Sequence, residues 1–329
     1  MTYPDRMLKL VLALAVAALA ASAAAQEWRP ERNVELIVPS SAGGSLDNFA
    51  RTIQRVWDAL KLVPTSSTVV NRAGGGHAVA YAYLDEQAGN PHFLCITSPT
   101  LLTSHINGRL PRTYTDVTPL AILVTEYIAF AVRPDSPIRT GKDLMEALKR
   151  DPGSLSVGLS SALGGTHHIS LGMPAQSAGV DMKGLKLVAF PSSSEAVTAL
   201  LGGHVDVIST SNVILAPHVA EGRLRAIAIS APKRISGPLA GAPTWPELGY
   251  KGVFENWRGV IGAKGITAAQ TAYWENVLRR VSESSDFRAF AEKNRWVVDF
   301  KGAAESKAFM KQAYDELKSV MSFLGLAKR

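Results

Sequence analysis

Four short segments rich in glycine and serine carry the groups that could bind a small anion. They are residues 39–45, 73–77, 160–166 and 191–194, and each leads into a stretch with helical spacing of apolar residues. At a helix start, free backbone N–H groups and the helix dipole favour a negative charge, and hydroxyls add neutral donors. Any one segment could be an ordinary turn or cap. Together, the four predict a site for a carboxylate held by uncharged groups and bridging water.

Titratable side chains beside these segments extend the candidate site. Asp47 falls in the first turn of its predicted helix. There its negative charge could interact favourably with the helix dipole, or its carboxylate could orient a ligand hydroxyl. His77 and His167 stand at similar helix starts, where each could be a structural donor or a ligand contact. An exported hydrolase that uses Asp47 with one of these histidines is an alternative. The candidate ligand-binding residues are Ser41, Ala42, Gly44, Ser45, Asp47, Gly75, His77, Ser98, Ser160, Ser161, Thr166, His167, Ser192 and Ser193.

Catalytic and cofactor motifs are absent from the sequence. There is no Gly-x-Ser-x-Gly elbow and no Walker loop, and Gly74-Gly-Gly76 lacks the third glycine of a dinucleotide fingerprint. The lone cysteine, Cys95, excludes an internal disulfide and zinc sites built from several cysteines. Adjacent His167 and His168 would point about 100° apart on a helix, so they cannot form a zinc pair. We therefore expect no catalytic residue, no metal and no cofactor.

Apolar strands alternate with helices and place these segments. The strands predicted at residues 34–38, 68–70, 155–159 and 185–190 each lead into one of the four segments. The alternation predicts an α/β fold with parallel, doubly wound sheets, in which loops that follow the strands open on one edge. Further predicted strands are residues 93–97, 127–132, 205–208, 224–229 and 259–262, and the C-terminal stretch 268–326 is predicted to be mostly helical.

Length and charge limit the class of protein. The 329 residues suit two domains of ~150 residues each. Lysine and arginine number 35 against 28 acidic residues, a formal balance of +7, and the basic residues are scattered along the chain. Scattered charge does not indicate nucleic-acid binding.

The first 26 residues read as a secretory signal peptide. Arg6 and Lys9 precede an apolar run from Leu10 to Ala25 that ends in three alanines. Cleavage after Ala25 is the prediction. A membrane anchor is the weaker interpretation, because the run is rich in alanine and shorter than the ~20 strongly apolar residues of a spanning helix. The mature chain is therefore expected to be exported, with no insertion in the membrane.

Several segments, in order, resemble one known family. The run Val38-Pro-Ser-Ser-Ala-Gly-Gly-Ser-Leu-Asp-Asn-Phe-Ala-Arg51 is similar to the first motif of the tripartite tricarboxylate transporter solute receptors, the TctC or Bug family. Residues 70–76, 160–168, 200–207 and 257–259 are similar to later motifs of that family. The resemblance covers essentially the whole mature chain. The sequence departs from the family pattern at Val70, at Ala73 and at Phe190-Pro191-Ser192, the last on a predicted binding loop.

The resemblance implies a two-lobed periplasmic-binding-protein fold. Each lobe would be a mostly parallel sheet flanked by helices, with a hinge and a ligand cleft between the lobes. The expected division is a signal peptide at 1–25, lobe one at 26–127 plus 253–329, and lobe two at 128–252. The implied pincer on a carboxylate consists of Ala42, Gly44, Ser45 and Asp47 facing Ser160, Ser161, Thr166 and His167.

The resemblance also implies a function. The chain would be a monomeric periplasmic receptor that captures a small organic anion and delivers it to membrane transporter subunits, with no role in binding nucleic acid. Closure of the lobes would be a hinge motion. An alternative is that the same module presents its ligand to the sensor of a two-component signalling system.

Overall fold

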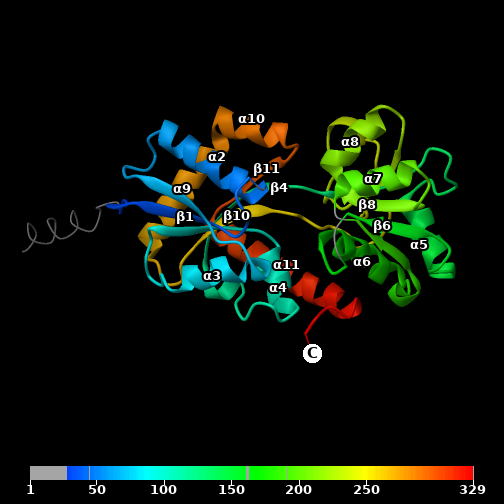
Figure 1. Ribbon diagram of the computed structural model, residues 1–329, viewed down its shortest axis with the longest axis horizontal. Helices are drawn as coiled ribbons and strands as arrows, with labels where there is room; N and C mark the ends of the chain where they lie inside the picture. The colour runs from blue at the N-terminus through cyan, green and yellow to red at the C-terminus, as the bar shows by residue number, and fades with distance from the viewer. Residues whose placement is uncertain (1–27, 44, 161–162, 191, 329) are drawn as a thin grey trace, which may run out of the picture.

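The computed structural model describes residues 28–43, 45–160, 163–190 and 192–328. The predicted signal peptide, Gly44 and Ser161 lie outside the described residues. The chain forms two α/β lobes side by side, each built on its own sheet (Figure 1). The two-lobed fold predicted from the sequence is confirmed.

Lobe one contains a six-stranded sheet in the order β11-β4-β10-β3-β1-β2. Its strands are β1 (Val34–Val38), β2 (Ser67–Asn71), β3 (Phe93–Thr97), β4 (Thr118–Thr125), β10 (Arg258–Gly262) and β11 (Val297–Lys301). Its helices are α2 (Ser45–Ala59), α3 (Ala78–Asp85), α4 (Thr100–Ile106), α9 (Ala268–Glu283), α10 (Ser285–Lys293) and α11 (Ala303–Phe323), with 3-10 turns η1 (Gly75–His77) and η2 (Tyr114–Asp116).

Lobe two contains a five-stranded sheet in the order β7-β6-β8-β5-β9. Its strands are β5 (Ile128–Val132), β6 (Ser156–Leu159), β7 (Lys186–Ala189), β8 (Val207–Ser211) and β9 (Arg225–Ile229). Its helices are α5 (Gly141–Arg150), α6 (Thr166–Ala178), α7 (Ser193–Leu201) and α8 (Asn212–Ala220), with 3-10 turns η3 (Met182–Gly184) and η4 (Gly237–Leu239).

Most strands of each sheet run in one direction. In lobe one β1 pairs in parallel with β2 and β3, whereas β10 runs antiparallel to both β3 and β4, and β11 runs antiparallel to β4. In lobe two β6 pairs in parallel with β7 and β8, and β5 runs antiparallel to β8 and β9. The prediction of mostly parallel sheets therefore describes the strand directions, with β10, β11 and β5 reversed.

The reversal of β5 and β10 follows from how the chain crosses between lobes. β4 ends at the carboxyl edge of its sheet, the chain crosses at once, and β5 must start from the facing edge of lobe two. β9 ends at that same edge, and after the return crossing β10 starts at the carboxyl edge of lobe one. The crossings therefore place residues near 126 and 258 where loops after parallel strands bind ligands.

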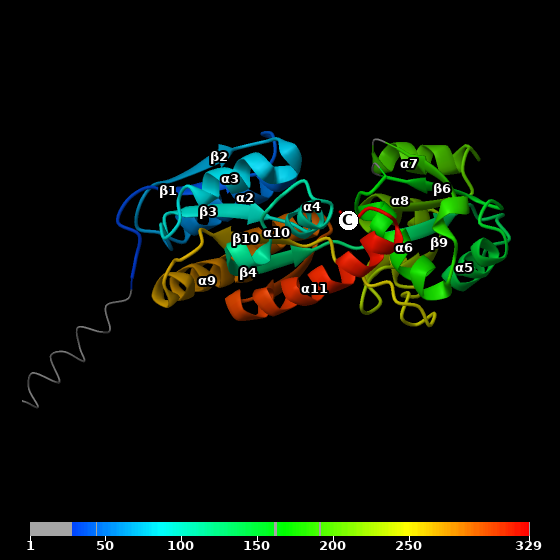
Figure 2. The same cartoon turned by 90° about the horizontal axis from the view of Figure 1, so that it is seen from below.

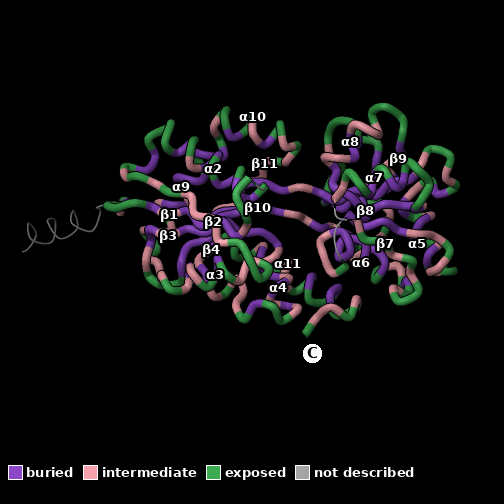
Figure 3. The backbone as a smooth tube through the Cα atoms, viewed as in Figure 1, coloured by how far each residue is buried: buried purple, intermediate pink, exposed green. Residues whose placement is uncertain are grey.

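Helices cover both faces of the lobe-one sheet. In α2, Phe49, Ile53 and Trp57 fall on one stripe and are fully buried against lobe one, with α9 and α10 on the same face. α3, α4 and α11 contribute to the core on the opposite face. Figure 3 shows the resulting pattern, with buried strands inside and exposed helix faces outside.

The last helix connects the two lobes. α11 starts on the lobe-one sheet and its C-terminal end packs against α6 of lobe two (Figure 2). Val320 and Met321 belong to the same buried cluster as Leu171 of α6, and the Gln176 amide donates to Ser319 Oγ at 3.4 Å. The lobes therefore share a core besides the two crossings.

The sequence missed some elements. β4 and β11 were not predicted, and β11 interrupts the C-terminal stretch that was expected to be mostly helical. The exact ends of the lobes stay a prediction. In the part of the chain that the structure describes, no helix combines the length and the apolar character needed to cross a bilayer.

Candidate functional site

The predicted residues fall into two sets, one on each lobe. Because β1, β2 and β3 are parallel neighbours, the lobe-one candidates from Ser41 to Ser98 follow their carboxyl ends. The lobe-two candidates from Ser160 to Ser193 follow β6 and β7 in the same way. Ser41, Ala42, Ser45 and Gly75 are exposed, whereas Ser98 is buried. The roles predicted for Gly44 and Ser161 stay predictions.

Asp47 organises the loop after β1. Its Oδ2 accepts hydrogen bonds from the Gly43 N–H at 2.8 Å and from Arg51 Nε at 2.9 Å, and its Oδ1 accepts one from Asn71 Nδ2 at 2.9 Å. Asn71 Nδ2 also donates to the Ser40 carbonyl at 3.0 Å. Burial alone would raise the pKa of Asp47, but the hydrogen bonds from Arg51, Gly43 and Asn71 outweigh it and lower the pKa. With both oxygens occupied, Asp47 is suited to positioning the loop, and direct contact with a ligand stays a prediction.

The loop after β2 has an unusual backbone. Gly74, Gly75, Gly76 and His77 are consecutive residues with positive φ, at 130°, 58°, 62° and 77°. Glycine adopts this region without strain, but His77 does so at a cost. Ser104 Oγ of α4 donates to the Gly76 carbonyl at 3.2 Å, and this hydrogen bond connects the turn to α4. The glycine run predicted as a binding loop is therefore a fixed left-handed turn that presents its backbone at the sheet edge.

In lobe two, serine and threonine side chains fix the start of α6. Ser160 Oγ donates to Thr210 Oγ1 at 2.9 Å, and Ser209 Oγ donates to the His167 carbonyl at 3.2 Å. His168, which the candidate set did not include, accepts a hydrogen bond from the Gly164 N–H through Nδ1 at 3.0 Å. Its role is to hold the loop that precedes α6.

His77 and His167 are neutral imidazoles with a free nitrogen. Burial, with a smaller contribution from the charge of Arg258, lowers the pKa of His77 to about 4. Burial lowers the pKa of His167 to about 4 as well. Among the described residues His77 Nδ1 and His167 Nε2 have no hydrogen-bond partner. Both nitrogens are buried, and an uncharged imidazole with an unpartnered nitrogen can donate to or accept from a ligand that reaches it, depending on its tautomer.

Ser192 and Ser193 start α7. Ser192 is the N-cap residue, since its Oγ accepts a hydrogen bond from the Glu195 N–H at 3.2 Å and donates to Glu195 Oε1 at 2.9 Å. The Phe190 N–H donates to the Leu159 carbonyl at 2.8 Å, which holds the end of β7 beside the end of β6. The two lobe-two loops therefore lie next to each other.

The crossings contribute residues that the sequence analysis missed. Glu126 and Asn256 exchange backbone hydrogen bonds at 3.3 and 3.0 Å, which pairs the two crossings. Glu126 Oε1 accepts a hydrogen bond from Ser211 Oγ at 2.6 Å, and its Oε2 lies 3.5 Å from Arg258 Nη2. Ser211 in turn caps α8 by accepting from the Val213 N–H. A chain of polar contacts therefore links Arg258 of lobe one to lobe two. Arg258 falls within the family-like motif at 257–259, but no pattern in the sequence placed it beside Glu126 and Ser211.

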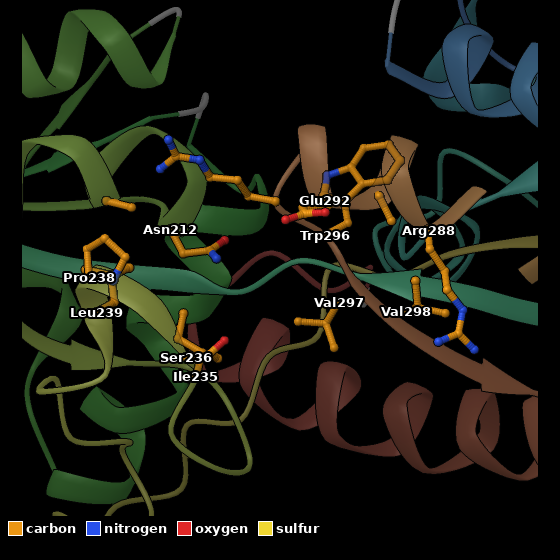
Figure 4. Close-up of a pocket in the computed structure, with 13 residues that line it drawn as sticks. Asn212, Ile235, Ser236, Pro238, Leu239, Arg288, Glu292, Trp296, Val297 and Val298 are labelled. Atoms are coloured by element: carbon orange, nitrogen blue, oxygen red, sulfur yellow. The ribbon is translucent and has the colours of Figure 1, made fainter. Parts of the chain in front are cut away.

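A groove of about 440 Å³ lies between the lobes beside these contacts (Figure 4). Its lobe-one side is formed by Trp296, which follows α10, and by Val297 at the start of β11. Its lobe-two side is formed by Ile235, Leu239 and Asn212. Arg295 Nη1 reaches across to donate to the Val213 carbonyl at 3.4 Å. The lobes therefore approach each other with an open space between them.

The arrangement gives no support to hydrolysis. Asp47 is hydrogen-bonded to Gly43, Arg51 and Asn71, and not to either histidine, so the Asp–His pair of the hydrolase alternative is not formed. Cys95 is fully buried, which raises the pKa of its thiol and leaves it unreactive. Within the described residues, no three His, Cys, Asp or Glu side chains are grouped to hold a metal ion.

Sequence comparison decides the family. The profile described as tripartite tricarboxylate transporter family receptor matches residues 53–326. The chain belongs to this family. The UPF0065 protein in the gbd 5′ region of Cupriavidus necator is 26% identical over 320 residues, 96% of this chain and 94% of that protein. Protein BugT of Bordetella pertussis is 27% identical over 257 residues, 77% of this chain and 76% of BugT.

Several solved structures share the fold. A TctC solute-binding protein from Polaromonas without ligand superposes with a TM-score of 0.80 at 24% identity, over 89% of this chain and 99% of that one. MatC from Rhodopseudomonas palustris with bound malate superposes with a TM-score of 0.66 at 22% identity, over 88% of this chain and 99% of that one. A second R. palustris protein, with adipate, superposes with a TM-score of 0.67 at 21% identity, over 91% of this chain and 99% of that one. Family and fold are those of solute-binding proteins and not of enzymes.

Proposed function

We propose that this receptor captures a small carboxylate between its two lobes in the periplasm and delivers it to a tripartite tricarboxylate-type transporter. The bound form would be closed by rotation about the paired crossings at Glu126 and Asn256. The protein acts as a binding module with no catalytic step, and as a monomer. Its transporter partner and its export by the N-terminal segment are parts of the same proposal.

The observation that carries the proposal is the meeting of two sheet edges. Loops after β1, β2 and β3 of lobe one and after β6, β7 and β8 of lobe two follow carboxyl edges that the crossings join directly. Several of these loops lead into helix starts, where unpaired N–H groups favour an anion. Ligand sites of α/β proteins lie at such edges.

Two features are compatible with a carboxylate ligand. The buried, unpartnered nitrogens of His77 and His167 could hydrogen-bond a carboxylate or a bridging water, while neither ring adds a charge at neutral pH. Asp47, the acidic residue of the first loop, is neutralised by its hydrogen bonds and by Arg51, so it does not repel an anion. MatC and the adipate-bound relative were solved with dicarboxylates, which makes this class the first to test.

Thermal unfolding with a panel of solutes tests the proposal. A ligand that binds only the folded state stabilises it by about 2.7 kcal/mol at a concentration 100 times Kd. We expect one or more carboxylates to raise Tm in a dose-dependent way, while the matching amides have little effect. If no carboxylate raises Tm, or if amides act equally, the assignment to carboxylates is wrong.

A further inference from the structure

Arg258 lies at the carboxyl edge of lobe one, outside the four loops rich in glycine and serine. It is the first residue of β10, and the next residue, Gly259, pairs with Thr97 at the end of β3. Its side chain is nine-tenths buried, with 9% of the residue exposed. The charge of Arg258 also contributes to lowering the pKa of His77, so the guanidinium acts on the same part of the site.

The Nη1 end of the Arg258 guanidinium has hydrogen-bond partners, whereas the edge formed by Nε and Nη2 lacks good ones. Nη1 donates to the Asn256 carbonyl at 2.8 Å, to Asn256 Oδ1 at 2.9 Å and to the Trp257 carbonyl at 3.1 Å. Nε has no partner in the described part of the chain, and Nη2 has a 3.5 Å contact with Glu126. Nε and Nη2 form the edge with which arginine binds a carboxylate through two parallel hydrogen bonds, normally at about 2.7–2.9 Å.

Glu126 does not fill that edge because lobe two holds it. Its other oxygen accepts the 2.6 Å hydrogen bond from Ser211 Oγ, which fixes the carboxylate at the start of α8. A buried cation with one long contact to its counter-ion is poorly compensated, so a better-placed anion stabilises it. The guanidinium lies over the Trp296 ring at 5.6 Å, and Trp296 lines the groove between the lobes. The guanidinium is therefore in contact with a side chain that lines the groove, although Nε itself is buried.

We propose that Arg258 is a specificity-determining residue that binds a second anionic group of the solute through its Nε and Nη2 edge. This inference rests on the proposed function, and it narrows the ligand class to dicarboxylates. The first carboxylate is bound by uncharged loop groups, and the second replaces the long Glu126 contact. Because Glu126 is held by lobe two, this exchange occurs where the lobes meet.

Matched pairs of ligands test this by isothermal titration calorimetry. Each dicarboxylate from malonate to adipate is compared with its monoamide, which keeps the shape and removes one charge. We expect the wild type to prefer at least one dicarboxylate by about tenfold or more, as a charge-assisted pair provides. Arg258→Gln should abolish this preference and leave monoamide affinity nearly unchanged, and Arg258→Lys should retain part of it. The inference is overturned if Arg258→Gln loses affinity equally for the dicarboxylate and the monoamide of each pair. It is also overturned if the wild type does not prefer any dicarboxylate.

Arg225→Gln is the control. Arg225 also has an unpartnered Nε, but its Nη atoms donate to the Pro134, Ser136 and Ile138 carbonyls at the opposite end of the lobe-two sheet. This variant should lose stability without any change in the dicarboxylate preference.

Glu126→Gln keeps the inference testable if Arg258 variants do not fold. It preserves an acceptor for Ser211 Oγ and removes the charge that competes for Arg258. The dicarboxylate preference should rise, by about threefold or more, because the charge that competes for this nearly buried guanidinium is gone. An unchanged or smaller preference overturns the inference. If monoamides bind but dicarboxylates do not, the role of Arg258 is wrong and the proposed function still stands. If no carboxylate binds at all, the proposed function itself is wrong.

Discussion

Single side chains fix the loops that would receive the ligand. The three hydrogen bonds accepted by Asp47 come from the loop backbone, from its own helix and from the end of β2. His168 does the same for the loop before α6 through its bond from Gly164. Asp47 and His168 therefore act on backbone geometry, and contact with the solute stays a proposal for backbone groups, hydroxyls, the two imidazoles and Arg258.

Replacing Asp47 by asparagine should weaken both ligand binding and folding. The change keeps the size of the side chain but removes the charge that Arg51 and the Gly43 N–H require, so we expect a loss of about 1–3 kcal/mol in each. Calorimetry and urea unfolding at pH 7 measure the two losses. Asp58→Asn, on the exposed end of the same helix, should change neither by a comparable amount. An unaltered affinity for Asp47→Asn would show that the loop does not need this carboxylate.

Burial of His167 should make folding stability depend on pH. Its pKa is about 4 in the folded protein and about 6.5 when unfolded, so the unfolded chain binds more protons between these values. The free energy of unfolding is therefore not reduced by His167 above pH 6.5. It falls as the pH drops toward 4, by about 3 kcal/mol at most. Urea unfolding from pH 4 to 7 should give a shallower dependence for His167→Gln. His204→Gln, at an exposed site of the same lobe, should keep the wild-type slope; identical slopes for His167→Gln and the wild type would contradict the argument.

At the level of elements, the left-handed turn from Gly74 to His77 is the least replaceable part of the site. Four consecutive positive φ values require glycine where the chain has it, and α4 holds the turn through Ser104. The turn places His77 at the start of α3 without a side-chain cap, which leaves the imidazole available at the edge.

Gly75→Ala should reduce ligand affinity beyond its cost in stability. An added Cβ meets Ala78 at 3.1 Å, and a left-handed alanine costs about 1–2 kcal/mol. Gly89→Ala provides the matched control, because Gly89 has φ of +75° with open space around its Cβ and lies in the turn before β3. Both variants should lower Tm, but only Gly75→Ala should raise Kd. Equal affinities in the two variants would remove this turn from the site.

Parts of this architecture could be predicted from local pattern, and others could not. β1 and β3 have the predicted bounds because each is a short apolar run between turns. β11, with the sequence VVDFK, is half-buried at the sheet edge, so its alternation is weak and it was included in a helical stretch. Arg258, Glu126 and Ser211 come together only through the crossings and the reversal of β10. No local pattern encodes that proximity, since 132 residues separate Glu126 from Arg258.

At the level of the whole molecule, several contacts between described residues link the two lobes, the Arg295–Val213 hydrogen bond among them. The crossings pair through Glu126 and Asn256, and the end of α11 packs on α6. Leu324 fills the space beside Gly172, where a Cβ would come within 2.8 Å of it. The Lys328 N–H donates to the Ile106 carbonyl at 2.8 Å and returns the tail to lobe one. The lobes can therefore rotate only by a hinge motion that keeps these contacts or exchanges them.

Ligand should shorten the distance between the lobes across the groove. Spin labels on cysteines at Asn48 of α2 and Ser194 of α7, both exposed, report this distance by pulsed electron paramagnetic resonance. The native Cys95 is fully buried and is replaced by alanine to give a clean background. With a carboxylate that raises Tm, the distance distribution should shift to shorter values, because binding to both edges stabilises the closed state. A pair within lobe one, at Asn48 and Glu86, should not change. An unchanged distance between Asn48 and Ser194 at saturating ligand would mean that the solute binds without closure, so the two edges would not act as a pincer.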